Sequence, residues 1–142
     1  MHGEHAITMR VVQACPTEGL SYRLPGLPLS FAEIAQQIYA DGLRFVGVAL
    51  GSNIGDHALT SNGADWQKPE LLRKCTEWHE VIVNGFRSLT TDELTRDVDF
   101  NSERFPTVLM ADWYVVNMVH HRGMMCTYLK SLRVDVPKIY VS

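Results

Sequence analysis

The sequence predicts an all-α protein, a bundle of four helices formed by a single domain over residues 1–142. Three observations lead to this prediction. Apolar residues recur every three or four positions in four separate segments, which is the period of a helix buried on one face. Capping residues mark helix starts and ends. The intervening stretches are rich in Gly, Pro, Asn and Ser, and none has the alternating pattern of a convincing strand.

The first helix is predicted at about residues 5–15. Ile7, Val11 and Ala14 fall on one of its faces because positions three and four apart are neighbours on a helix. Pro16 follows directly and ends the helix, since proline lacks the amide hydrogen that the next turn requires. We therefore expect a short helix that adds one apolar face to the core.

The second helix is predicted from Ser30 to about Leu50. Ser30 is followed three residues later by Glu33, which is the spacing of a capping box. Gly51 follows the last turn and is the expected C-cap. Its apolar face is expected to carry Ile34, Ile38, Phe45 and Val48.

The third helix is predicted to start near Pro69, because proline is favoured in the first turn of a helix. The apolar residues that follow alternate in steps of three and four, the strongest helical period in the chain: Leu71, Cys75, Trp78, Ile82, Phe86 and Leu89. The polar stretches at 51–65 and 90–106 are predicted as connecting segments without regular structure.

The last helix is predicted from about Thr107 to Leu132, and residues with helical spacing on one face are Leu109, Trp113, Asn117, His121, Tyr128 and Leu132. Asn117 and His121 therefore stand where core residues belong. His120 points about 100° away from His121, so these adjacent histidines cannot easily share one metal ion. We expect His120 and Arg122 at the surface, with Arg122 pairing with a carboxylate or a helix end.

The segment "HHRGMMCTYLKSLRVDVPKIY" at 120–140 resembles the closing segment of DinB/YfiT-like proteins. That segment usually reads HxxxHRGQ, then a tyrosine–leucine pair and a VP-I-Y tail. The stretch "SFAEIAQQIYADGLRFVGVALG" at 30–51 is similar to the second helix of the same superfamily. The resemblance implies a four-helix bundle of up-down-down-up topology, a homodimer, and a divalent metal such as Zn or Ni held by three histidines.

By position, the family's three metal ligands correspond to Gln37, Asn117 and His121, so one of the three imidazoles remains. Zinc and nickel favour imidazole, whereas neutral amide oxygens bind them poorly. We therefore expect a metal-free or weakly metal-binding protein with a small-molecule pocket between the second and last helices. The alternative is a divalent-metal-dependent enzyme of S-transferase, isomerase or hydrolase type, with His121 as a metal ligand.

Two more residues could belong to such a site. Asp41 lies four residues after Gln37 and could supply a carboxylate or act as a base. His79, on the flank of the third helix, could be an accessory ligand. In the simpler interpretation, His121 exchanges hydrogen bonds with Asn117 and Gln37 without a metal. Asp41 is then a surface residue and His79 a boundary histidine with its own partners.

Composition excludes some classes of protein. The net charge is −3 and no basic block is present, which argues against a nucleic-acid partner. No apolar run is long enough to span a membrane, and the first residues lack the order of a signal peptide. The three cysteines, Cys15, Cys75 and Cys126, are far apart and form no CxxC pair. We expect free thiols in a cytoplasmic protein.

Overall fold

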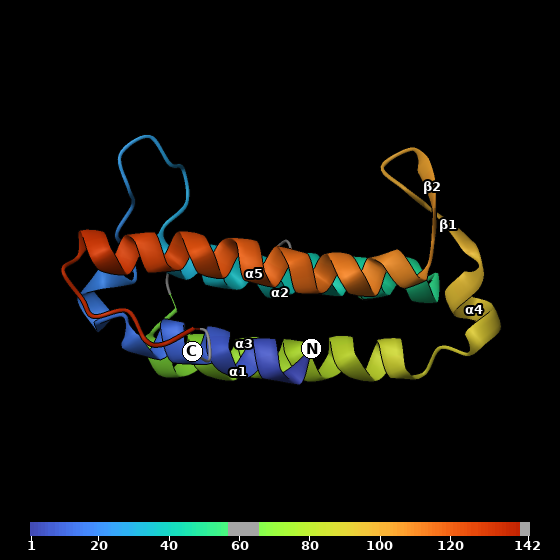
Figure 1. Cartoon of the computed structure of the whole chain (residues 1–142), viewed down its shortest axis with the longest axis horizontal. Helices are drawn as coiled ribbons and strands as arrows, with labels where there is room; N and C mark the ends of the chain where they lie inside the picture. The colour runs from blue at the N-terminus through green and yellow to red at the C-terminus, as the bar shows by residue number, and fades with distance from the viewer. Residues whose placement is uncertain (57–65, 140–142) are drawn as a thin grey trace.

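The computed structural model describes residues 1–56 and 66–139, so most of the predicted connecting segment at 51–65 lies outside the described residues. Figure 1 shows four long helices packed along a common axis: α1 (His2–Ala14), α2 (Phe31–Leu50), α3 (Lys68–Arg87) and α5 (Val108–Ser131). A 3₁₀ turn (Thr17–Gly19) follows α1. The all-α bundle predicted from the helical periods is confirmed.

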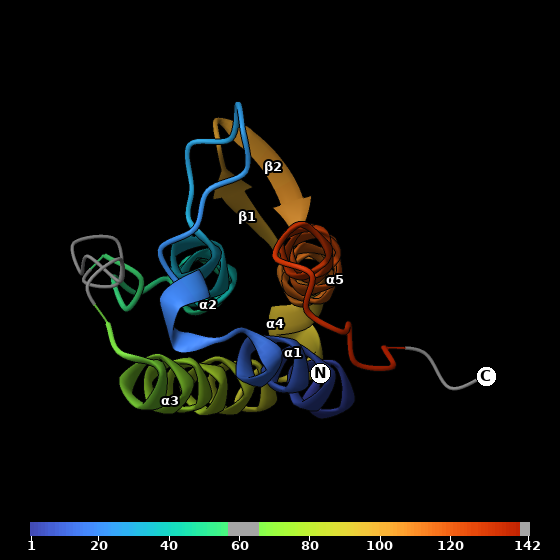
Figure 2. The same cartoon turned by 90° about the vertical axis from the view of Figure 1, so that its left-hand side faces the viewer.

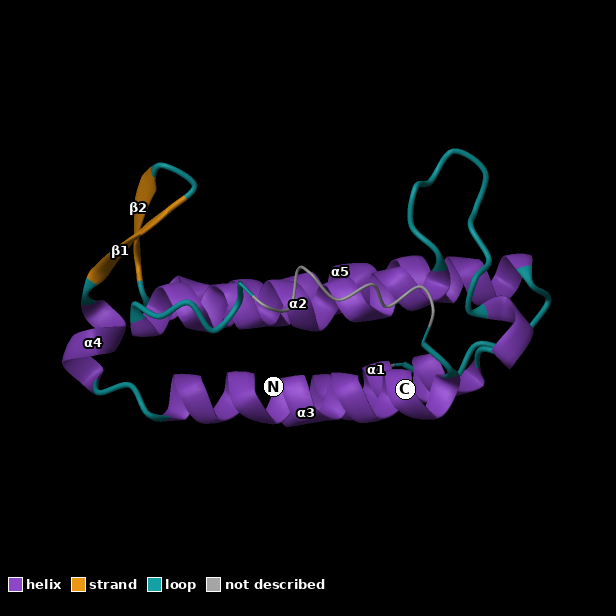
Figure 3. Cartoon of the chain, turned by 180° about the vertical axis from the view of Figure 1, so that it is seen from behind, coloured by secondary structure: helices purple, strands orange, loops and turns teal. Residues whose placement is uncertain are grey.

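The helices form two layers, with α2 beside α5 in one layer and α1 beside α3 in the other (Figure 2). The chain runs in one direction along α1 and α5 and in the opposite direction along α2 and α3 (Figures 1 and 3). This is the up-down-down-up order that the family resemblance implied. No helix within the described residues is long and apolar enough to cross a membrane.

The ends of α2 follow the capping residues read from the sequence. The Ser30 side chain accepts a hydrogen bond from the Glu33 backbone N–H, and the Glu33 carboxylate accepts one from the Ser30 backbone, which completes the capping box. Gly51 takes a φ of 63°, the left-handed conformation that glycine adopts at no steric cost. The first helix is longer than predicted, because it already begins at His2.

The prediction of an irregular segment at 90–106 is wrong. A short helix, α4 (Thr91–Thr95), is followed by an antiparallel hairpin of β1 (Asp97–Phe100) and β2 (Glu103–Pro106). Its two-residue turn uses positive φ values at Asn101 and Ser102. The hairpin forms because its inward side chains pack on the bundle: Val98, Phe100 and Phe105. Thr90 and Glu93 form a capping box at α4 that the sequence did contain.

The core-facing stripe of α5 lies one residue further along the chain than predicted. The residues of α5 that are buried are Met110, Tyr114, Met118, Arg122, Met125, Cys126, Tyr128 and Leu129. The predicted stripe is only half-buried at Trp113, Asn117 and His121. The error arose because α5 is apolar on almost every side, so its hydrophobic pattern does not select one face.

The expectation that Arg122 lies at the surface is also wrong. Only 2% of its side chain is exposed, and its Nη1 lies 2.7 Å from the Glu4 carboxylate on α1. The same nitrogen donates to the Glu4 backbone carbonyl at 3.2 Å. The expected carboxylate partner is therefore present, but the ion pair stands between α1 and α5 inside the bundle.

Candidate functional site

The antiparallel register of α2 and α5 brings the predicted site residues together. Phe45 contacts Trp113, with ring centroids 6.3 Å apart. One turn along, Asn117 Nδ2 donates to the Asp41 carboxylate at 3.1 Å. From the first pair to the second, the residue number falls by four on α2 and rises by four on α5. The next pair in this register is therefore Gln37 with His121. Near the far end the Tyr128 hydroxyl donates to the Leu29 carbonyl at 2.6 Å, which follows the same register.

We call Gln37, Asp41, Asn117 and His121 the α2–α5 polar cluster. It lies on the face of α2 and α5 that carries the hairpin, because Phe100 contacts both Phe45 and Trp113 one turn away. Figure 2 shows the hairpin projecting from the α2–α5 layer on the side away from α1 and α3. In Figure 1 the hairpin stands at one end of this face and the loop before α2 at the other.

The hydrogen bond from Asn117 fixes the orientation of its amide. An ionised carboxylate only accepts hydrogen bonds, so the amide NH₂ must face Asp41. The Asn117 Oδ1 atom is consequently turned elsewhere. It is buried and has no hydrogen-bond partner, and the same is true of Gln37 Oε1 and His121 Nδ1.

The network expected among His121, Asn117 and Gln37 is therefore not the one that forms, since Asn117 instead donates to Asp41. Burial lowers the pKa of His121, and neighbouring His120 lowers it further, while Asp41 acts in the opposite direction. His121 is thus a neutral imidazole near pH 7, with one nitrogen free to accept a hydrogen bond. His120 is exposed, as expected.

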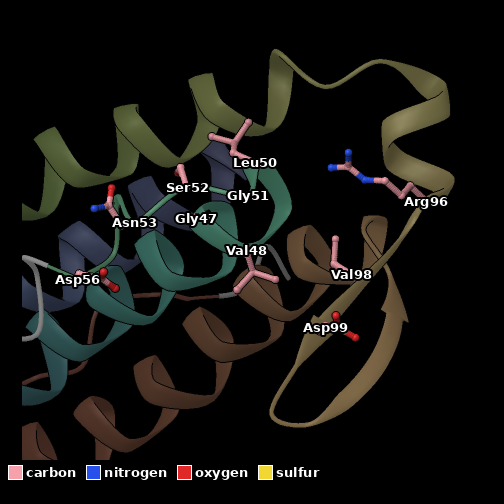
Figure 4. A pocket seen from close by; sticks show the side chains of 10 residues that line it. All are labelled: Gly47, Val48, Leu50, Gly51, Ser52, Asn53, Asp56, Arg96, Val98 and Asp99. Atoms are coloured by element: carbon pink, nitrogen blue, oxygen red, sulfur yellow. The ribbon is translucent and has the colours of Figure 1, made fainter.

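A separate hollow lies elsewhere on the molecule. An open depression of about 570 Å³ lies between the C-terminal end of α2 and strand β1 (Figure 4). The Arg96 guanidinium on its rim donates to the Ala49 carbonyl at 3.2 Å and so caps the end of α2. No residue of the α2–α5 polar cluster lines this depression.

Two crystal structures share this architecture. A DinB-like protein of Bacillus subtilis, YjoA, aligns with a TM-score of 0.76 over 99% of this chain and 94% of its own, at 16% sequence identity. A DinB-like protein of Bacillus cereus aligns with a TM-score of 0.74 over 96% of this chain and 91% of its own, at 20% identity. The chain has the DinB-like fold. No family model and no curated protein matches the sequence.

The metal that the DinB/YfiT resemblance implied does not fit the donors at these positions. The unpartnered atoms of Gln37, Asn117 and His121 do come from the three implied positions. Two of these atoms, however, are neutral amide oxygens, which bind Zn and Ni poorly. The single imidazole of His121 is not enough to hold either metal. Among the residues that the structure describes, no group of three His, Cys, Asp or Glu side chains is arranged to hold a metal ion.

His79 does not join the α2–α5 polar cluster of this DinB-like bundle. It is 2% exposed, and both ring nitrogens have partners, Tyr114 at 2.9 Å and His2 at 3.2 Å. In the structure His79 is thus a histidine with its own partners, Tyr114 and His2. The sequence could not show this, because the partners lie 35 and 77 residues away.

The cysteines offer no nucleophile to the α2–α5 polar cluster. All three are free and buried. Burial raises the pKa of Cys15 to about 11 and raises the pKa values of Cys75 and Cys126 as well. These thiols stay protonated near neutral pH, and the thiol is a much poorer nucleophile than the thiolate.

Proposed function

We propose that this protein binds a small molecule at the α2–α5 polar cluster, and that the cluster is metal-free or binds a divalent metal weakly. The observation that carries the proposal is the set of three buried, unpartnered atoms on Gln37, Asn117 and His121. Each such atom costs about 1–3 kcal/mol when it has no partner. A ligand that supplies the missing hydrogen bonds would remove this cost.

The chemistry of the cluster points to the type of ligand. Amide oxygens only accept hydrogen bonds, and the neutral His121 ring accepts through one nitrogen. The ligand must therefore donate, as a hydroxyl or an amine does. The side chains of Gln37 and His121 are only half-buried, so rotation of their outer bonds can turn their unpartnered atoms towards a molecule on the hairpin face. Asp41 holds the Asn117 amide and supports this arrangement.

Fluorescence of Trp113 tests the proposal, because Trp113 lies one turn from Asn117 on the same face of α5. A variant with Trp66→Phe and Trp78→Phe leaves Trp113 as the only tryptophan. We expect glycerol or ethanolamine, used as hydroxyl and amine probes, to change its emission at millimolar concentration. Asn117→Ala should abolish the response, whereas Val116→Ala, on the exposed side of the helix, should leave it unchanged.

Elemental analysis separates this function from the alternative. After dialysis against zinc or nickel, the purified protein should retain well under one equivalent of metal. A full equivalent that is lost in His121→Ala would overturn the metal-free interpretation and favour the metal-dependent enzyme. A Trp113 signal that none of the probes changes would contradict the small-molecule site.

A further inference from the structure

A second group of polar rings lies where α1 packs beside α3, on the side of that layer that faces α2 and α5. His2 and His5 come from α1, and His79 comes from α3. The rings of His5 and His79 are stacked, with centroids 4.0 Å apart and planes 5° from parallel. His79 Nε2 lies 3.2 Å from His2 Nδ1. We call these three residues the histidine cluster, and it has no part in the function proposed above.

The hydrogen bonds of this cluster have a single possible direction. Arg87 Nη2 lies 3.1 Å from His2 Nε2, and a guanidinium only donates, so His2 Nε2 must accept. In a neutral His2 the proton is then on Nδ1, which donates to His79 Nε2. His79 in turn carries its proton on Nδ1 and donates to the Tyr114 hydroxyl at 2.9 Å.

An additional proton on His2 Nε2 or on His79 Nε2 breaks this chain. A proton on His2 Nε2 would face the Arg87 N–H, and a proton on His79 Nε2 would face the N–H of His2. In both cases two donors would meet without an acceptor. A proton on His5 as well would place a second positive ring against His79 at the stacking distance of 4.0 Å. This chain of hydrogen bonds therefore holds only while His79 is neutral, and charged rings at both His5 and His79 would repel each other.

We propose that the histidine cluster is an acid-sensitive latch, which holds α1 on α3 while its rings are neutral and releases α1 when they take up protons. Release would uncover the apolar side chains with which α1 closes the core, such as Val11 and Val12. Other polar attachments of α1 include the ion pair from Glu4 to Arg122 and the hydrogen bond from Lys68 Nζ to the Gln13 carbonyl at 3.2 Å.

The charged and titratable groups around the cluster do not stabilise added protons. α1 contributes the α-amino group of Met1, which lowers the pKa of His79. Tyr39 on α2 bonds to His5 Nδ1 at 2.8 Å, and burial raises the pKa values of Tyr39, Tyr114 and Cys75, so these groups are neutral. Arg87 on α3 and Arg122 on α5 are positive, and the nearby Glu4 is already paired with Arg122.

Burial, together with the neighbouring histidines, lowers the pKa of His5 to about 4 and that of His79 to about 3, from a usual 6.5. The unfolded segment thus binds more protons than the closed latch between about pH 6.5 and these values. The contribution to stability is complete above pH 6.5 and is lost as the pH falls towards 4. Each histidine changes the opening equilibrium by up to about tenfold per pH unit.

Hydrogen exchange of the full chain, followed by mass spectrometry, tests the latch. Between pH 6.5 and 4.5, the protection factors of the amides in α1 should fall at least about tenfold, after correction for intrinsic rates, while those in α2 change little. A parallel loss in α1 and α2 would show global acid unfolding and overturn the proposal. Unchanged protection of α1 would overturn it too.

Arg87→Glu provides the sharper test, because it replaces the donor facing His2 with an acceptor. The carboxylate also places a negative charge beside the cluster, which opposes the repulsion among its rings when they take up protons, so release of α1 should move to lower pH. Arg104→Glu makes the same change of charge on the exposed hairpin and should leave the midpoint unchanged. His5→Phe keeps a stacked ring but removes one titrating group, and it should flatten the pH dependence of α1 protection. A midpoint unmoved by Arg87→Glu, or an unaltered slope in His5→Phe, would refute the latch.

Discussion

Single residues at the implied metal positions determine which chemistry this bundle supports. The resemblance implies imidazoles at three positions; Gln37 and Asn117 present amide oxygens at two of them, and His121 presents an imidazole at the third. The amide of Asn117 is also held by Asp41 at 3.1 Å, which draws it into a hydrogen bond between α2 and α5.

Two substitutions at these positions are expected to create a metal site. Gln37→His combined with Asn117→His would place three imidazoles on the facing turns of α2 and α5, a ligand set that suits zinc and nickel. We expect the double variant to retain close to one equivalent of zinc after dialysis, measured by elemental analysis. If the variant is folded and holds no metal, our placement of the three residues is wrong.

A matched control carries the same number of added histidines. Gln37→His with Val116→His moves one of them about 100° around α5, to a position that is 63% exposed. This pair should bind no more zinc than the unmodified chain. Equal zinc binding by both double variants would show that the metal is held at the surface.

At the scale of elements, the close approach of the helices depends on particular glycines. Gly123, within α5, does not serve this role, because a Cβ there would meet nothing within 4 Å. A Cβ at Gly42 would lie 2.5 Å from the Tyr114 ring and 2.6 Å from Ile82. Gly42 is therefore the position at which α2 makes room for both α3 and α5.

The two glycines predict opposite effects of alanine. Gly42→Ala should lower the free energy of unfolding by about 1–3 kcal/mol, because the added methyl group overpacks a close contact. Gly123→Ala should raise it by up to about 1 kcal/mol, because alanine favours the helix and meets no neighbour. Urea denaturation of both variants measures the two changes. Equal effects would show that packing at Gly42 has been misjudged.

At the scale of the whole molecule, the outer side of α5 presents apolar surface to solvent. Val108, Val116 and Val119 are exposed by 42%, 63% and 37% respectively. Scattered exposed valines are ordinary on soluble proteins, but these three lie along one helix. We predict that these valines form the interface of the homodimer that the family resemblance implies.

Light scattering at micromolar concentration checks this prediction. We expect the mass of a dimer, and we expect Val116→Glu to shift it to that of a monomer, because the charge would be buried without a partner. Val81→Glu, a control at a 40% exposed valine on α3, should leave the dimer intact. A monomeric unmodified chain would contradict the expectation.

The sequence alone determined what depends on local chemistry and on helical period. The capping box at Ser30 and the C-cap at Gly51 set the ends of α2, because these hydrogen bonds form between neighbours in the chain. The closing segment at 120–140 indicated the DinB-like fold, and placed His121 one turn from Asn117. The hairpin at 97–106 was missed because its strands are short and gain their stability from packing on Phe45 and Trp113.

Only the tertiary structure decided which polar groups meet. The inward face of α5 could not be chosen from a helix that is apolar nearly all round, so Arg122 was misplaced by sequence and is buried against Glu4. Asn117 donates to Asp41 and His79 joins His2 and His5 because separate helices pack in one register. Contacts between distant segments depend on that packing, and no local pattern in the sequence encodes it.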